Sequence, residues 1–165
     1  METAKWQELI NVLGKISTAY DNAVSLGERK HKALVVIDMD GLSKILDEEQ
    51  LLAGKIQKLE RQRGEILKEL AKSESSIQPN TKMEELFRLA PTRAIEERLN
   101  FLHKNLSKKL NQTIQLRDNN QILAQGALDA VHYHLNRIGG ATVENSYGNK
   151  GGGVVTHKKN FEFKA

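Results

Sequence analysis

The 165-residue sequence contains no cysteine, only two prolines and 5% aromatic residues. Without cysteine the chain has no disulfide, no Cys-bearing zinc site and no thiol nucleophile. Few prolines and few rings favour long amphipathic helices, whose apolar stripes are built from Leu and Ile. The longest apolar run, residues 33–37, is too short for a membrane span or a signal-peptide core. We therefore expect a cytoplasmic protein without direct membrane insertion.

The net charge is +4, from 25 basic and 21 acidic side chains. Residues 139–165 hold four lysines and two glutamates, which leaves 21 basic against 19 acidic side chains in residues 1–138. A stretch so nearly balanced indicates a solvated surface and not a phosphate-binding stripe. We expect no nucleic-acid partner. A rival interpretation, binding of nucleic acid by the basic tail, predicts steep salt dependence.

Apolar residues at steps of three and four predict one long helix over residues 3–36 and a second over residues 39–72. Asp38 is suited to cap the second helix. Gly27 lies inside the first helix and suggests a bend or fraying over residues 27–32. Residues 33–37 are rich in β-branched side chains, but a lone strand needs a partner, so a helix is favoured there.

Thr81 and Glu84 form a capping-box sequence, which predicts a short helix that stops near Pro91. Thr92 then caps the longest segment, residues 93–138, whose apolar side chains keep one face throughout. A helix of that length indicates a coiled coil or an extended bundle. We predict an all-α fold, an antiparallel bundle or coiled coil of three long helices plus one short helix.

The composition changes after Ile138, since six of the twelve glycines lie in residues 139–165. Such a segment buries too little apolar surface to offset its ordering entropy. We predict a helical bundle over residues 1–138 and a flexible, Gly-rich basic tail over residues 139–165. Apolar residues within the tail suit a segment that orders on a partner.

No set of acid, base and nucleophile is recognisable, and residues 148–153 lack the order of a phosphate-binding loop. Glu28 and His31 match the Glu-x-x-His spacing of di-iron bundles once, and Asp129 with His132 nearly does. His132 and His134 lie two positions apart and so point to different sides of a helix. We predict no catalytic, cofactor or metal site and no enzymatic activity.

The late part of the longest helix carries a wide apolar surface, made of Leu123, Ala127, Leu128, Val131, Tyr133 and Leu135. A helix longer than its neighbours leaves part of such a surface for a partner. Burial in the core and binding of a partner both remain open from the sequence.

Several segments together match the pattern of a known family over nearly the whole chain. They are Ala33-Leu34 with Asp38-Met-Asp-Gly-Leu42, Glu48-Glu49, Leu59-Glu-Arg-Gln-Arg63, Asn119-Asn120 with Leu123, Asn145-Ser-Tyr147-Gly148-Asn-Lys-Gly151 and Lys158-Lys159. With these residues the chain resembles the FlgN family of flagellar export chaperones for hook-associated proteins.

The resemblance implies a cytosolic, non-enzymatic chaperone without cofactor that binds the C-terminal helical segments of hook–filament junction proteins and prevents their premature assembly. It further implies delivery to the membrane export gate and leaves a homodimer open. Carried over to this sequence, the segment-binding residues are Asn120, Leu123, Ala127, Val131 and Leu135, and the gate-docking residues are Tyr147 and Gly148. The main rival is a structural coiled-coil or adaptor protein, which predicts a stable oligomer.

Overall fold

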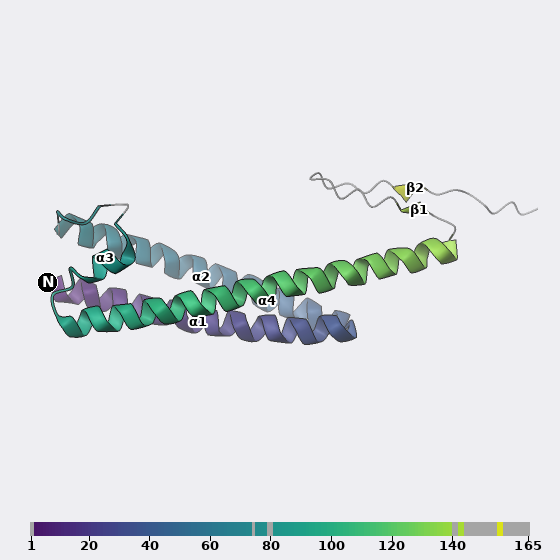
Figure 1. The fold of residues 1–165 in the computed structure, drawn as a ribbon, viewed down its shortest axis with the longest axis horizontal. Helices are drawn as coiled ribbons and strands as arrows, with labels where there is room; N and C mark the ends of the chain where they lie inside the picture. Colours follow the sequence, from purple (N-terminus) through teal and green to yellow (C-terminus); the bar gives the residue numbers. More distant parts are fainter. Residues whose placement is uncertain (1, 74, 79–80, 140–141, 144–154, 157–165) are drawn as a thin grey trace, which may run out of the picture. The chain divides into compact units, whose positions relative to one another are not determined.

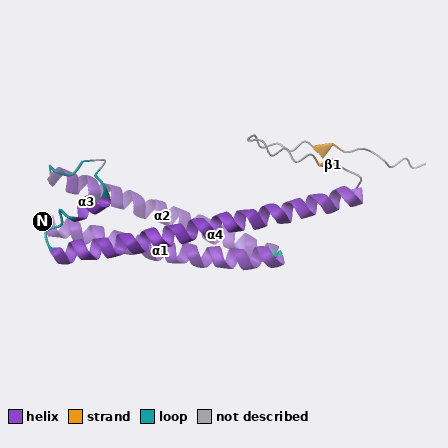
Figure 2. Cartoon of the chain, viewed as in Figure 1, coloured by secondary structure: helices purple, strands orange, loops and turns teal. Residues whose placement is uncertain are grey.

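The computed structural model describes residues 2–73, 75–78, 81–139, 142–143 and 155–156 (Figure 1). The elements are α1 (Glu2–Val36), α2 (Met39–Ser73), α3 (Met83–Phe87), α4 (Arg93–Gly139), β1 (Thr142–Val143) and β2 (Val155–Thr156). The predicted all-α class, with three long helices and one short helix, is confirmed (Figure 2). The two short strands pair antiparallel, with Thr142 opposite Thr156.

The chain forms two compact units that divide within α4, between Asn120 and Gln121. Unit 1 holds α1, α2, α3 and α4 up to Asn120, and unit 2 holds the rest of α4 with β1 and β2. Most of the tail predicted over residues 139–165 lies outside the described residues. Its flexibility and the domain boundary at residue 138 stay predictions.

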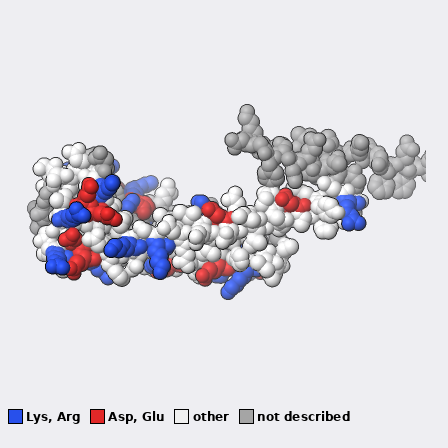
Figure 3. All heavy atoms as spheres, in the orientation of Figure 1, with Lys and Arg blue, Asp and Glu red and all other residues white. Residues whose placement is uncertain are grey.

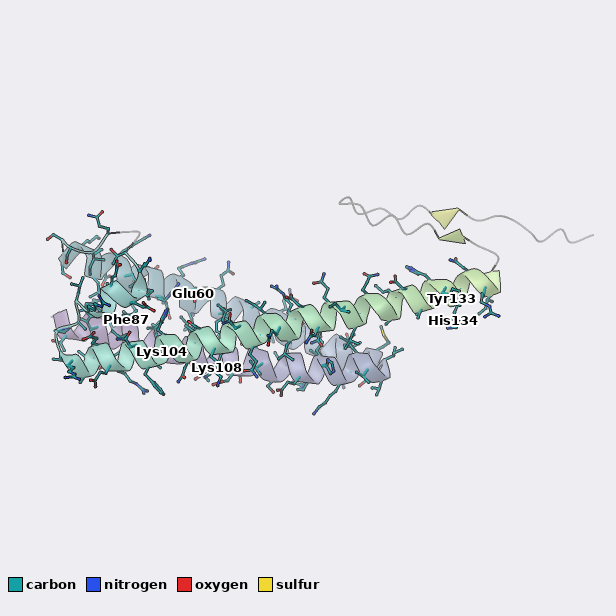
Figure 4. The ribbon with its side chains drawn as sticks, in the orientation of Figure 1. Glu60, Phe87, Lys104, Lys108, Tyr133 and His134 are labelled. Atoms are coloured by element: carbon teal, nitrogen blue, oxygen red, sulfur yellow. The ribbon has the colours of Figure 1, made fainter. Side chains whose placement is uncertain are left out.

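The main core of unit 1 lies where all four helices meet, at the end of the bundle that contains α3. Trp6, Leu70, Phe87 and Leu99 come from four different helices and are all fully buried. Phe87, which Figure 4 labels on α3, also meets the ring of His103 on α4 edge to face, with centroids 5.7 Å apart. The short helix α3 thus caps this end of the bundle with an aromatic side chain.

A smaller apolar cluster lies toward the turn between α1 and α2. Its buried members are Leu26, Ala33 and Ile45, which come from α1 and α2 alone. These two helices are antiparallel and tied across by ion pairs between Lys5 and Glu69 at one end and between Arg29 and Glu48 at the other. Residues 33–36 are helical, as the sequence favoured.

The turn after α1 closes with a residue in the left-handed conformation. The amide of Asp38 donates to the carbonyl of Ala33 at 2.9 Å, and that of Ile37 donates to Leu34 at 3.3 Å. This is the hydrogen-bond pattern of a Schellman motif, whose left-handed position is usually glycine. Here it is Ile37, with φ of 55°. A β-branched residue in this conformation is strained.

Helix α1 runs through Gly27 without a break, so the suggested fraying over residues 27–32 is wrong. The glycine has a packing role instead. A Cβ atom built on Gly27 would lie 3.2 Å from the Cβ and Cδ1 atoms of Leu116 on α4. Glycine at this position therefore permits the close approach of α4 to α1.

Two of the three predicted caps are confirmed. The Asp38 carboxylate accepts from the Gly41 amide at 3.0 Å, and the Thr92 hydroxyl accepts from the Ile95 amide at 3.4 Å. The capping box at Thr81 is wrong, because α3 begins after Lys82 and has no side-chain cap. The Thr81 hydroxyl instead accepts from the Gln78 amide at 2.8 Å and closes the preceding loop.

Candidate protein-binding surface

The apolar face of α4 continues from unit 1 into unit 2. In unit 1 this face is buried at Leu99, Leu102 and Asn120, which are at most 6% exposed. Further steps of three and four residues lead to a set that we name the α4 stripe, made of Leu123, Ala127, Leu128, Val131, Leu135 and Ile138. The same face that forms the core in unit 1 therefore reaches the surface in unit 2.

Exposure along the α4 stripe rises toward its C-terminal end. Leu123 and Ala127 are half-buried, whereas Val131 is 49% and Leu135 is 57% exposed. Residues 121–139 contain just two charged side chains, Asp129 and Arg137. Figure 3 accordingly shows this part of α4 mostly white, in contrast to the mixed blue and red surface around α3. An apolar and nearly uncharged helix surface of this kind suits contact with another protein.

The aromatic side chain near the end of α4 lies off the stripe. Tyr133 is exposed and lies two positions from both Val131 and Leu135, which places it on a different side of the helix. Its ring meets that of His134 edge to face, with centroids 5.7 Å apart (Figure 4). The apolar surface is thus narrower than the sequence suggested, because Tyr133 does not belong to it.

Asn120 is the one predicted contact residue whose side chain is taken up inside unit 1. It is 3% exposed, and its Nδ2 atom donates to the Gly27 carbonyl at 2.9 Å. Its Oδ1 atom lies 3.2 Å from Nδ1 of His31. Because an amide oxygen only accepts, Nδ1 of His31 carries the hydrogen in this contact. We name Gly27, His31, Leu116 and Asn120 the α1–α4 junction.

A second polar contact joins α4 to α1 nearer the main core. The Lys109 ammonium donates to the hydroxyl of buried Ser17 at 2.9 Å and to the carboxylate of Asp21 at 2.7 Å. Contacts on α1 advance from residues 17–21 to residues 27–31 while those on α4 advance from 109 to 120, so the two helices run in the same direction. Two polar contacts therefore hold this part of α4.

The turn between α1 and α2 exposes a second apolar group, Val35, Val36, Ile37 and Met39. All four are more than 60% exposed, and we name them the turn patch. The sequence signal for this patch was the unbroken apolar run, which was weighed as a membrane span and as a strand but not as an exposed surface. The run lies at the end of α1, and within the described part of the chain no element covers its last residues.

Ion pairs on unit 1 range from partly buried to exposed. Arg29 holds Glu48 through two hydrogen bonds of 2.7 and 2.9 Å. The hydrogen bonds lower the pKa of the Glu48 carboxyl and raise the pKa of the Arg29 guanidinium. Lys5 and Glu69 shift each other's pKa in the same way. Each of these two pairs places a basic and an acidic side chain together, so their charges offset each other.

Among the described residues, no three His, Asp or Glu side chains gather in a way that could hold a metal ion. His31, half of the Glu-x-x-His match, is engaged with Asn120. No helix in the described ranges is apolar enough over sufficient length to cross a membrane. Tyr147 and Gly148, predicted to dock at the export gate, lie outside the described residues.

The fold and surface define a class: an all-α helical bundle whose apolar α4 face is exposed beyond the core. The model of the FlgN protein family matches residues 1–153, and the chain belongs to the FlgN family. It is a family of flagellar export chaperones, with hook-associated proteins as binding partners, and not a family of enzymes. Searches of curated proteins and of solved structures return no significant match.

Proposed function

We propose that this protein is a cytoplasmic chaperone of flagellar type III export. It binds the C-terminal helical segments of hook–filament junction proteins, prevents their premature assembly and delivers them to the export gate. The observation that carries the proposal is the α4 stripe, an exposed continuation of the face that forms the core of unit 1. Membership of the FlgN family supports the same role.

The chemistry of the stripe suits an amphipathic helical segment. Such a segment lays its apolar side chains, spaced three and four residues apart, against an apolar surface. Leu123, Ala127, Val131 and Leu135 offer matching spacing on α4. Ordering a flexible segment costs free energy, so affinity stays moderate and the cargo can be released. Asn120 is buried and is therefore not available for direct contact with such a segment.

Docking at the gate is assigned to Tyr147 and Gly148. The family match extends to residue 153 and therefore includes both residues. Tyrosine offers a large contact area with few rotors to immobilise, which suits an anchor. We expect Tyr147→Ala to leave binding of the junction-protein segment unchanged while export in cells falls. Normal export by this variant would show that Tyr147 is not needed for docking at the gate.

The test of segment binding compares two exposed apolar surfaces of the same chain. The double variant Val131→Ser with Leu135→Ser shortens the α4 stripe, and Val35→Ser with Val36→Ser alters the turn patch. Isothermal titration with purified C-terminal segments of hook-associated proteins should show a loss of roughly tenfold or more for the first, since each Val or Leu buried contributes about 1.5–3 kcal/mol. The second variant should bind like the natural protein. If only the second variant lost affinity, the binding site would be the turn patch and not the α4 stripe.

A second candidate function is a structural coiled-coil or adaptor protein, and the same exposed stripe favours it. In that case the stripe pairs with a second copy of the chain and forms a homodimer. Sedimentation analysis separates the two: a dimer that persists when the junction-protein segment is added in excess supports the adaptor. Dissociation into a complex of one chaperone with one segment supports the export chaperone.

A further inference from the structure

Asn120 is the last residue of unit 1, and the α4 stripe begins three residues later. We infer that Asn120 is a register lock, a positioning residue that holds α4 at one position along α1 and so determines which α4 residues stay in the stripe. The inference rests on the proposed function, because the stripe is the proposed binding surface. It replaces direct contact with the partner as the role of this side chain.

A lock is needed because the apolar residues of α4 do not define a position by themselves. Its inward face repeats Leu at positions 99, 102 and 106. Similar apolar side chains at helical spacing pack almost equally well when one helix slides by a turn or more along its neighbour. A single buried asparagine in such a seam favours the position in which its amide finds partners.

The α1–α4 junction supplies those partners in the observed position of α4. A carbonyl oxygen accepts two hydrogen bonds, so the Gly27 carbonyl can serve both its own helix and Nδ2 of Asn120. Leu116, one turn earlier on α4, lies so close to Gly27 that a Cβ there would be only 3.2 Å from its side chain. If α4 slides, the side chain of Asn120 loses the Gly27 carbonyl and His31, and Leu116 meets a residue that has a side chain.

The contact of Lys109 makes the position unique. Lys109 lies 11 positions before Asn120 on α4. Its partners on α1, Ser17 and Asp21, lie ten positions before the partners of Asn120, which are Gly27 and His31. Sliding α4 by that spacing would bring Lys109 opposite His31, where an imidazole takes the place of the Asp21 carboxylate. The two contacts are not interchangeable, so one register satisfies both.

The absence of cysteine allows the register to be measured directly. Cysteines introduced at exposed Glu28 on α1 and Gln115 on α4 can carry spin labels for distance measurement by double electron–electron resonance. In the otherwise natural chain we expect one narrow distance distribution. In Asn120→Leu, which keeps the side-chain size but removes both hydrogen bonds, we expect a broadened or doubled distribution. Asn119→Leu, the same change at the exposed neighbouring residue, is the matched control and should resemble the natural chain.

A second measurement connects the register to function. Affinity for the purified C-terminal segment of a hook-associated protein should fall at least fivefold in Asn120→Leu and stay unchanged in Asn119→Leu. His31→Ala removes one of the two hydrogen bonds of Asn120 and changes an exposed residue, so we expect the variant to fold. Its distance distribution should broaden less than that of Asn120→Leu.

An unchanged distance distribution in both Asn120→Leu and His31→Ala would overturn the lock. If affinity then still fell in Asn120→Leu, Asn120 would contact the partner directly. A changed distribution with unchanged affinity would overturn the link between register and binding. Failure of the proposed function is distinct from these results, because the natural chain would then show a single distance and no affinity for the segment.

Discussion

The two ends of unit 1 are held together differently. At the α3 end, side chains from four helices enclose fully buried residues such as Trp6 and Phe87. Toward the turn end, the cluster around Leu26 and Ile45 comes from two helices, and α4 is joined there through the polar contact of Asn120 and the packing of Leu116 against Gly27. Apolar burial dominates the first end, and specific hydrogen bonds position α4 at the second.

This difference has a consequence for the dynamics of the bundle. Local opening follows from few buried apolar contacts, so the turn end should open at a lower free energy than the α3 end. The α4 stripe begins immediately after the Asn120 contact. Stability and the proposed binding function are therefore assigned to opposite ends of α4.

The largest expected effect is a loss of unfolding free energy when a buried leucine is replaced by alanine, and the same replacement is compared at the two ends of unit 1. Leu99→Ala leaves a cavity enclosed by four helices and should cost about 4 kcal/mol of unfolding free energy. Leu26→Ala lies in the two-helix cluster, where neighbours can relax, and should cost about 2 kcal/mol. Urea unfolding followed by circular dichroism measures both. Equal losses would show that the two ends are equally well packed.

A smaller effect of opposite sign is expected at the turn. Ile37→Gly removes about 1–2 kcal/mol of left-handed strain and adds about 0.5–1 kcal/mol of unfolded-state entropy, for a net gain of about 0.5–1 kcal/mol. The melting temperature should therefore rise. Val36→Gly, at the neighbouring helical position, is the control and should lower it. A decrease for Ile37→Gly would mean that its exposed side chain contributes more than its backbone strain costs.

The smallest effect concerns the ion pair beside the turn end. Hydrogen bonds from Arg29 lower the pKa of Glu48 from its ordinary value of 4.5, so the charged carboxylate favours the folded state above that pH. This contribution is lost as pH falls through the lower folded-state pKa. Glu48→Gln should lower the melting temperature by less than about 2 °C at neutral pH, because the pair is exposed.

In strong acid the Glu48 carboxyl is protonated in both the folded and the unfolded state. There, Glu48→Gln should melt at the same temperature as the natural protein. Glu28→Gln, an exposed glutamate of α1, serves as the control and should change little at either pH. A difference between Glu48→Gln and the natural protein that persists in strong acid would assign the effect to packing and not to charge.

Much of the fold could be predicted because it depends on residues close in sequence. The three long helices follow from apolar spacing, and the caps at Asp38 and Thr92 follow from side chains three positions from their partners. The capping box at Thr81 failed for a local reason too, since its hydroxyl had an alternative partner in the loop before it. Short-range competition of this kind is hard to rank from a sequence.

The candidate site was predictable in part. The apolar residues of the α4 stripe were recognised from spacing, while whether they lay in a core or at the surface depended on elements that spacing does not locate. Asn120 was grouped with them because it shares their face. Its burial against α1 follows from a hydrogen bond between residues 93 positions apart, which no local pattern reveals.

By itself the sequence determined the helical class, the lengths of the helices and most of their ends, because backbone hydrogen bonds within a helix join residues four positions apart. Only the tertiary structure decided the role of Gly27, the strain at Ile37 and the burial of Asn120. Each of these depends on how closely one segment approaches another or on how a turn closes. Such distances are set by the packing of the whole unit.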